Sequence, residues 1–248
     1  MNLKQKTVDL LKADCPSGYS IGAAKERHTD IIMPPFVSDQ VLLAHECLRK
    51  LLTDYDFHSV LDIGCGEGLH SDIFLQNGKI VFSLDYGKSP YLMRREDRKN
   101  IIIGDFMKYR FGSQTFDAVW CSHVLEHQPD SHQFLLRVHS VLRENGVLAV
   151  TIPPLKHDIV GGHVSLWNAG LLLYHLVLAG FDCRHAAVKK HGYNISVIVV
   201  KRSIDIMSEL VFDSGDIRTI QPYLPDGISY RDSLADVQFN GDIDELNW

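Results

Sequence analysis

The sequence lacks several features that mark particular classes of protein. It has no run of 18 or more apolar residues, so no membrane-spanning helix is expected. Its five cysteines are scattered and form no C-x-x-C pair, which argues against a disulfide framework or a zinc site. The first residues lack the pattern of a signal peptide. These absences predict a cytoplasmic protein with reduced thiols.

A strong basic patch is also missing. The net charge is −6, and the densest basic cluster, residues 94–99, is interrupted by Glu96 and Asp97. Such mixed charges are typical of a solvated helix face, so a long nucleic acid is not expected as a partner. The apolar content of 45% over 248 residues is enough for a substantial core.

The most informative segment that is present covers residues 60–68. A short apolar run, typical of a buried strand, leads into Gly64, Gly66 and Gly68, and a helical pattern follows from Leu69. Glycine lets the backbone turn sharply and approach a ligand, and free N–H groups at a helix start attract negative charge. The segment therefore predicts a strand–loop–helix cradle for a nucleotide-like cofactor, the alternative being a tight turn that binds nothing.

The spacing of the glycines indicates which cofactor. The dinucleotide fingerprint G-x-G-x-x-G requires glycine where this chain has Leu69. The pattern here is D-x-G-x-G-x-G, beginning at Asp62, with Cys65 between two of the glycines. It resembles motif I of the class I S-adenosylmethionine-dependent methyltransferases.

Two further acids follow predicted strands. Asp85 ends the second strand, 17 residues after Gly68, where an acid can accept hydrogen bonds from ribose hydroxyls. Asp105 follows the third strand. The resemblance implies that Asp85 binds the ribose, that Tyr86 lines the adenine side, that Asp105 accepts from the adenine amino group, and that Phe106 packs on the ring.

Residues 116–127 and 142–154 resemble the later motifs of the same family, and the resemblance covers about residues 40–200. It implies an α/β, Rossmann-like fold with a seven-stranded, mostly parallel sheet and helices on both faces. Strand seven is expected to be antiparallel and inserted between strands five and six. The implied cofactor is S-adenosyl-L-methionine, with these cofactor-binding residues: Asp62, Gly64, Cys65, Gly66, Gly68, Asp85, Tyr86, Asp105, Phe106 and Ser122.

The chain divides into an N-terminal helix and lid-like segment (1–38), the methyltransferase domain (39–202) and an acidic C-terminal extension (203–248) with no assigned place in the core. Within the domain, Ser165 is the expected N-cap of a helix that Gly180 ends. Residues 181–188 and 195–200 are expected to be strands six and seven.

Histidines are the candidates for catalysis, because four of them are expected near the carboxyl ends of strands four and five. His163 is the first candidate for a general base, then His157 and His123. His123 and His127 are four residues apart, but the order V-L-E-H is typical of the methyltransferase motif, so no metal site is predicted.

The favoured function is methyl transfer to the hydroxyl of a small molecule or saccharide, with a histidine base. Residues 156–173 resemble proteins of bacterial surface-polysaccharide biosynthesis. The alternatives are N- or carboxyl-methylation of a metabolite or protein side chain, and a catalytically silent cofactor-binding scaffold. A nicotinamide oxidoreductase is a further alternative, disfavoured by Leu69.

Overall fold

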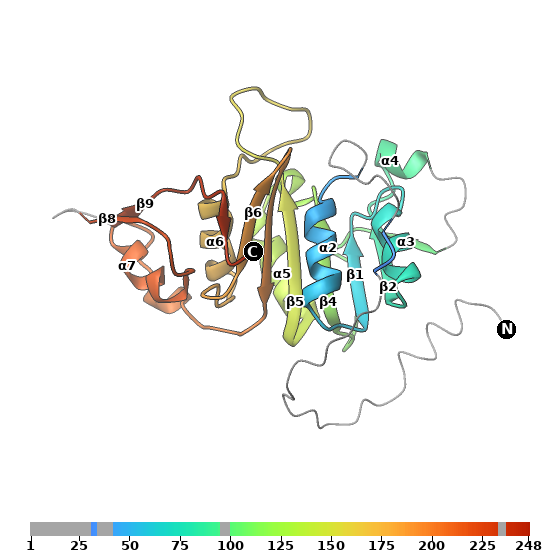
Figure 1. The fold of residues 1–248 in the computed structure, drawn as a ribbon, viewed down its shortest axis with the longest axis horizontal. Helices are drawn as coiled ribbons and strands as arrows, with labels where there is room; N and C mark the ends of the chain where they lie inside the picture. Colours follow the sequence, from blue (N-terminus) through green and yellow to red (C-terminus); the bar gives the residue numbers. More distant parts are fainter. Residues whose placement is uncertain (1–30, 34–41, 95–99, 233–236) are drawn as a thin grey trace.

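A computed structural model describes residues 31–33, 42–94, 100–232 and 237–248. Among these residues, one eight-stranded sheet forms the centre of the molecule, in the order β10-β6-β7-β5-β4-β1-β2-β3 (Figure 1). Its strands are β1 (Ser59–Ile63), β2 (Ile80–Asp85), β3 (Ile101–Ile103), β4 (Phe116–Ser122), β5 (Leu142–Ile152), β6 (Ala187–His191), β7 (Asn194–Val200) and β10 (Glu245–Leu246).

The strand directions confirm the expected topology. Strands β1 to β5 pair in parallel, and β7 lies between β5 and β6, antiparallel to both. The sheet has eight strands instead of the expected seven, because β10 pairs with the outer edge of β6. Since β1, β2, β4 and β5 run in one direction, the loops that follow them meet at one edge of the sheet.

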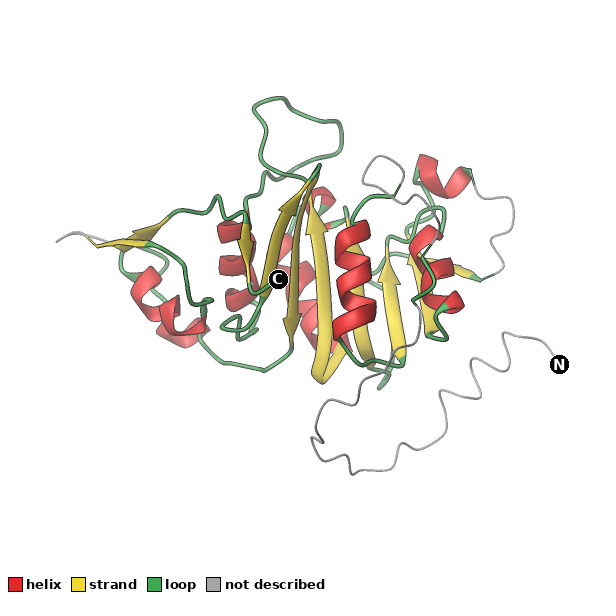
Figure 2. Cartoon of the chain, in the orientation of Figure 1, coloured by secondary structure: helices red, strands yellow, loops and turns green. Residues whose placement is uncertain are grey.

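Helices cover both faces of the sheet, and its central strands are therefore buried on both sides. On one face, α2 (His45–Asp54) and α3 (Leu69–Gln76) pack on Val60 and Trp120. On the other, α5 (Ser131–Val141) and α6 (Ala169–Leu178) pack on Leu61 and Val119. The side chains of neighbouring residues in a strand thus point to opposite faces of the sheet, as the two-residue period of a strand requires. A short helix, α4 (Pro90–Met93), follows β2 (Figure 2).

Two expected boundaries were wrong. The N-cap of α6 is Asn168, whose side chain accepts a hydrogen bond from the Leu171 N–H, whereas the Ser165 hydroxyl accepts from the Trp167 indole. Strand β6 begins at Ala187 and not at residue 181, because residues 182–186 form a turn. Gly180 does end α6, with φ of +91°.

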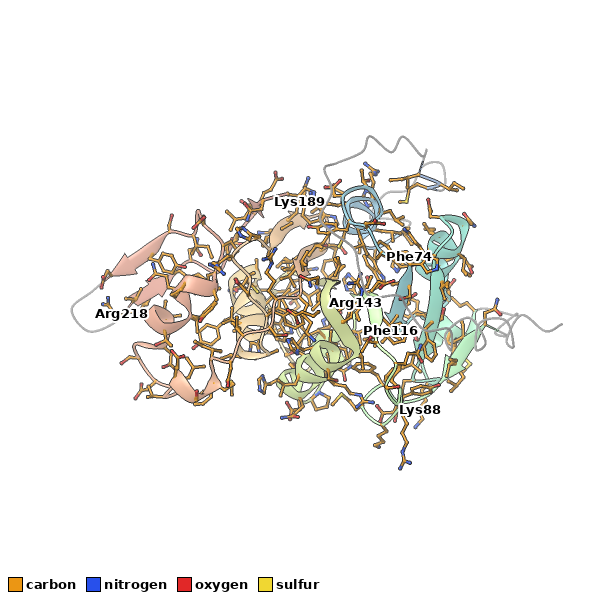
Figure 3. All side chains as sticks on the ribbon, turned by 90° about the horizontal axis from the view of Figure 1, so that it is seen from below. Phe74, Lys88, Phe116, Arg143, Lys189 and Arg218 are labelled. Atoms are coloured by element: carbon orange, nitrogen blue, oxygen red, sulfur yellow. The ribbon has the colours of Figure 1, made fainter. Side chains whose placement is uncertain are left out.

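The C-terminal extension folds back onto the domain. It contains α7 (Asp216–Ile220) and the hairpin of β8 (Tyr230–Asp232) and β9 (Val237–Phe239). Its apolar residues Ile206, Ile220 and Leu224 join the core on the α6 side. Arg218 of α7 forms an ion pair with Asp232 of β8 and marks this part in Figure 3, on the opposite side of the molecule from Phe74 of α3.

The expected N-terminal helix and most of the lid-like segment (1–38) lie outside the described residues. Among the residues that are described, no helix is long and apolar enough to cross a membrane.

Candidate active site

The glycine loop lies where the order of the strands reverses. Strand β1 has β2 on one side and β4 on the other, and open α/β sheets bind ligands in the crevice beyond such a reversal. Gly64, Gly66 and Gly68 have φ angles of +69°, +52° and +78°. These positive φ angles belong to the left-handed conformation, which is unfavourable for a residue with a Cβ. The conformation therefore explains why glycine occupies these three positions.

Asp85 connects the loop to the end of β2. Its Oδ2 accepts a hydrogen bond from the Gly66 N–H at 3.0 Å, and its Oδ1 accepts from the Gly87 N–H at 2.8 Å. The residue is only 4% exposed. Each carboxylate oxygen has a second lone pair, so Asp85 can order the loop and still accept from a ligand.

Asp62 lies beneath the loop. Its Oδ2 accepts from the Ser71 hydroxyl at 2.5 Å, and that hydroxyl also lies 2.7 Å from the hydroxyl oxygen of Ser83. Burial raises the pKa of Asp62 to about 7, and the nearby charge of Asp85 adds to the rise. Asp62 therefore supports the loop from below through the first turn of α3.

The residues expected on the adenine side have unequal exposure. Tyr86 is 59% exposed, whereas Phe106 is 7% exposed and packs on Phe134. Asp105 is half-buried, and its Oδ1 accepts from the Met107 N–H at 2.9 Å. Ser122 is half-buried at the end of β4. A contact between Phe106 and an adenine ring would use only the small edge that remains accessible.

Three of the four histidines come together at the ends of β4 and β5. His123 has a φ of +54°, uncommon for a residue with a Cβ, and its Nδ1 lies 3.2 Å from Glu126 Oε1. His127 Nε2 lies 3.9 Å from the same oxygen, and the His127 ring contacts the His163 ring with 5.0 Å between centroids. We call these four residues the histidine cluster.

His157 lies outside this cluster. It is exposed on the loop after β5, whereas His163 is half-buried on the same loop. Burial lowers the pKa of His163 below 6.5, and the neighbouring His127 and His123 act in the same direction, while Glu126 opposes them. A His163 ring that is neutral at pH 7 has a nitrogen lone pair available.

The glycine loop packs against the segment that carries His123 and Glu126. A Cβ added at Gly64 would lie 2.4 Å from Cγ2 of Val124, the residue that follows His123. Gly64 is therefore needed for space as well as for its backbone angle. This packing places the glycine loop next to the segment after β4, from which His123, Glu126 and His127 come.

A long loop, residues 153–168, rises above this edge of the sheet (Figure 2). It carries His163 and, with Tyr193, lines a small pocket. Lys156 of this loop lies over the Tyr193 ring, with its Nζ 4.2 Å from the centroid.

The sequence-based predictions missed three contributors to this region: Glu126, Tyr193 and Asn194. Glu126 is completely buried, and Asn194 Oδ1 lies 2.9 Å from His123 Nε2. Tyr193 stacks on His123. Only the adjacency of Glu126 to His127 gave a signal in the sequence. Tyr193 lies in the turn between β6 and β7 and Asn194 begins β7, both more than 65 residues further along the chain.

Comparisons with known proteins agree with this geometry. Residues 61–150 match a family model described as a methyltransferase domain. The chain is 32% identical over 103 residues to a ubiquinone biosynthesis O-methyltransferase of Glaesserella parasuis, covering 37% of this chain and 44% of that protein. It is 27% identical over 178 residues to a probable S-adenosylmethionine-dependent methyltransferase of Mycolicibacterium smegmatis, covering 68% and 66%. The chain thus spans less than two thirds of the length of these relatives.

Among solved structures, a 1,6-didemethyltoxoflavin-N1-methyltransferase of Burkholderia thailandensis with bound S-adenosylhomocysteine superposes with a TM-score of 0.50. The two are 19% identical, and the match covers 65% of this chain and 78% of that one. At this identity the likeness bears on the fold. The family model thus identifies residues 61–150 as a methyltransferase domain, and the chain is similar to S-adenosylmethionine-dependent methyltransferases in sequence and in fold.

Proposed function

We propose that the protein transfers a methyl group from S-adenosylmethionine to a hydroxyl of a small molecule or saccharide. The observation that carries the proposal is the close packing of Gly64 against Val124, which lies between His123 and Glu126 in the chain, so the glycine loop adjoins the segment of the histidine cluster. The matched Glaesserella relative is named as an O-methyltransferase, which supports a hydroxyl acceptor. A role in bacterial surface-polysaccharide biosynthesis is the finer form of this proposal.

The residues of the loop fit the cofactor. Glycine at position 64 lets the loop pack against Val124, where the Cβ of any other residue would collide. Asp85 would hold the ribose hydroxyls through its free lone pairs, with Asp105 and Tyr86 on the adenine side. Gly66, Gly68 and Cys65 would line the end that carries the methionine part, with Asp62 and Ser122 as neighbours.

When bound, S-adenosylmethionine supplies a methyl group on a positively charged sulfur; the acceptor oxygen bonds to the methyl carbon while the carbon–sulfur bond breaks and the sulfur keeps the electron pair. The chain's task is to hold the acceptor in line and to remove its proton. Positioning alone can contribute up to about 7–11 kcal/mol, and a general base adds about 10²–10⁴-fold.

The histidine cluster is the group that can activate the hydroxyl. A neutral histidine can take the proton directly, which is the role expected for His163, His157 or His123 from the sequence. His163 fits best, because it is half-buried and lines the pocket under the 153–168 loop. The same lone pairs can instead bind a metal ion that acidifies the hydroxyl.

The test uses methyl transfer to a panel of hydroxyl, amine and carboxylate acceptors with a labelled methyl group. His163→Ala should lower the turnover of a hydroxyl acceptor by about 10²-fold or more while leaving the affinity for S-adenosylhomocysteine unchanged. Turnover with a carboxylate acceptor that is insensitive to His163→Ala would overturn the hydroxyl proposal, since an ionised carboxylate needs no base.

We also propose a cytoplasmic location, supported by the state of the cysteines. Cys47, Cys121 and Cys183 are buried free thiols. Burial raises the pKa of Cys47 to about 12 and also raises the pKa values of the other two. Free thiols are typical of a reducing compartment.

A further inference from the structure

Glu126 presents an electrostatic problem that the proposed methyl transfer does not explain. The residue is 0% exposed, and neither of its carboxylate oxygens has a hydrogen-bond partner among the described residues. Burying an ionised carboxylate without a partner is strongly unfavourable, so such groups are normally paired or coordinate a metal. A positive charge is therefore expected beside Glu126.

In their neutral forms the nearest histidines do not supply that charge, and their other contacts select the tautomer of each neutral ring. His127 Nδ1 lies 2.7 Å from the carbonyl oxygen of Gly162, which can only accept, so the proton is assigned to Nδ1 and Nε2 keeps a lone pair. That lone pair lies on the nitrogen 3.9 Å from Glu126 Oε1.

His123 repeats the arrangement. Its Nε2 lies 2.9 Å from Asn194 Oδ1, and the orientation of the Asn194 amide is fixed because the Ala44 N–H donates to Oδ1 and Nδ2 donates to the His191 carbonyl. The proton of His123 is therefore assigned to Nε2, which turns the lone pair of Nδ1 toward Glu126 at 3.2 Å. In these neutral forms, a lone pair of each ring faces the Glu126 carboxylate.

His163 completes the set. One ligand atom from each of Glu126, His127 and His163 lies within 4.8 Å of the others. We propose that these three residues bind a divalent transition-metal ion of the Zn²⁺ class, with His123 beside the site. Metal–ligand bonds of about 2.0–2.1 Å in a tetrahedron place ligand atoms roughly 3.3 Å apart, so closure of the set requires shifts of an ångström or so.

The donor set indicates the kind of metal and the kind of site. Two imidazoles and a carboxylate favour zinc, iron, cobalt or manganese over magnesium, and this combination with a fourth open position is typical of catalytic zinc. The bond from His127 Nδ1 to a backbone carbonyl is the usual outer support of a metal-binding histidine. Of the three ligands, His163 also lines the pocket under the 153–168 loop, and His127 is exposed.

The consequence for catalysis rests on the proposed function. The open position would take the acceptor's oxygen, and the metal would lower the pKa of that hydroxyl so that its proton leaves to solvent. The oxygen would then attack the methyl carbon as above. In this form His163 uses its lone pair as a ligand and not as a base.

The test begins with the full chain stripped by a chelator and titrated separately with Zn²⁺, Co²⁺, Mn²⁺ and Mg²⁺. Calorimetry reports affinity and stoichiometry, and the visible spectrum of the Co²⁺ form reports tetrahedral nitrogen and oxygen ligands. Glu126→Gln, which keeps the shape of the side chain, and His163→Ala, on a loop, remove one ligand each. His185→Ala, on an exposed histidine outside the cluster, is the matched control.

We expect one Zn²⁺ or Co²⁺ per chain, at least about tenfold weaker binding in both ligand variants, and unchanged binding in the control. No binding by the native chain, or equal binding by all four proteins, would overturn the metal site. The affinity for S-adenosylhomocysteine is measured in the same samples. If the native chain binds S-adenosylhomocysteine but no metal, only the metal site is overturned. If it does not bind S-adenosylhomocysteine, the proposed function is overturned, whatever the result for the metal.

Discussion

The two sides of the site are built by different means. On the cofactor side, Gly64 and Gly66 act through backbone angles and N–H groups, and the carboxylate of Asp85 at the end of the neighbouring strand holds the Gly66 N–H. On the acceptor side, Glu126, His127 and His163 act through side chains, one of them on a long loop. The first side is held by the sheet itself. The second depends on contacts between distant segments, so acceptor chemistry can change while the cofactor cradle stays the same.

The largest effect that tests this contrast is expected at Gly64. In Gly64→Ala the new Cβ would collide with Val124 in addition to adopting an unfavourable φ. We expect the affinity for S-adenosylhomocysteine, measured by calorimetry, to fall by more than about 100-fold, or roughly 3 kcal/mol.

Gly112→Ala is the matched control for that variant, because Gly112 has a φ of +63° but no atom within 4 Å of the added Cβ. It should lose some stability from the backbone strain and none of the ligand affinity. Equal losses of affinity in both variants would mean that the effect is one of global stability, and the contrast would fail.

Asp85→Ala is expected to have the next largest effect on the cofactor side. It removes the acceptor of the Gly66 and Gly87 N–H groups and, in the proposed function, of the ribose hydroxyls. The affinity for S-adenosylhomocysteine should fall by about 1–3 kcal/mol. Asp85→Asn, which keeps one carbonyl oxygen, should lie between this variant and the native chain, whereas an unchanged affinity in Asp85→Ala would exclude Asp85 from the site.

The raised pKa of Asp62, which lies beneath the loop, predicts that the stability of the chain depends on pH. Its pKa is about 7 in the folded chain and about 3.9 in an unfolded one. Between these values the folded state holds a proton that the unfolded state has released, so the free energy of unfolding falls as the pH rises through this window.

Asp62→Asn should remove that pH dependence. Urea unfolding at pH 5 and pH 7.5 should show that the native chain loses about 2 kcal/mol more than the variant over this interval. Parallel pH profiles for the two proteins would show that Asp62 is ionised in the folded state throughout.

Where the sequence determined the backbone, prediction was accurate. The spacing of Gly64, Gly66 and Gly68 predicts the loop, and the apolar run that precedes it predicts the buried strand β1. Resemblance to the family supplied the position of β7. Where a side chain's surroundings come from distant segments, as for Glu126 beneath His123 and His163, no local pattern could have shown complete burial.

The C-terminal extension illustrates the same limit. Its acidic, turn-rich sequence gave it no place in the core, yet Gly170 and Gly241 bring it into backbone contact with α6 through a hydrogen bond of 2.9 Å. A Cβ at Gly241 would lie 2.5 Å from Asn168 Oδ1, the group that caps α6.

The smallest expected effect is that of Gly241→Ala. Disturbing this cap should cost about 1 kcal/mol of stability and lower the Tm by a few degrees, without changing the affinity for S-adenosylhomocysteine. Gly161→Ala, which has open space around the added Cβ, is the control. A loss of ligand affinity in Gly241→Ala would show that the extension contributes to the cofactor side.

The most direct test of the central claim is calorimetric titration of the native chain, Glu126→Gln and Gly64→Ala with S-adenosylhomocysteine, and of the native chain with NAD. If the two sides are separate, the native chain and Glu126→Gln should each bind one S-adenosylhomocysteine per chain with equal affinity. Gly64→Ala should show a large loss of this affinity, and the native chain should not bind NAD. Binding of NAD without S-adenosylhomocysteine, or undiminished binding in Gly64→Ala, would contradict the assignment of the glycine loop as the cofactor cradle.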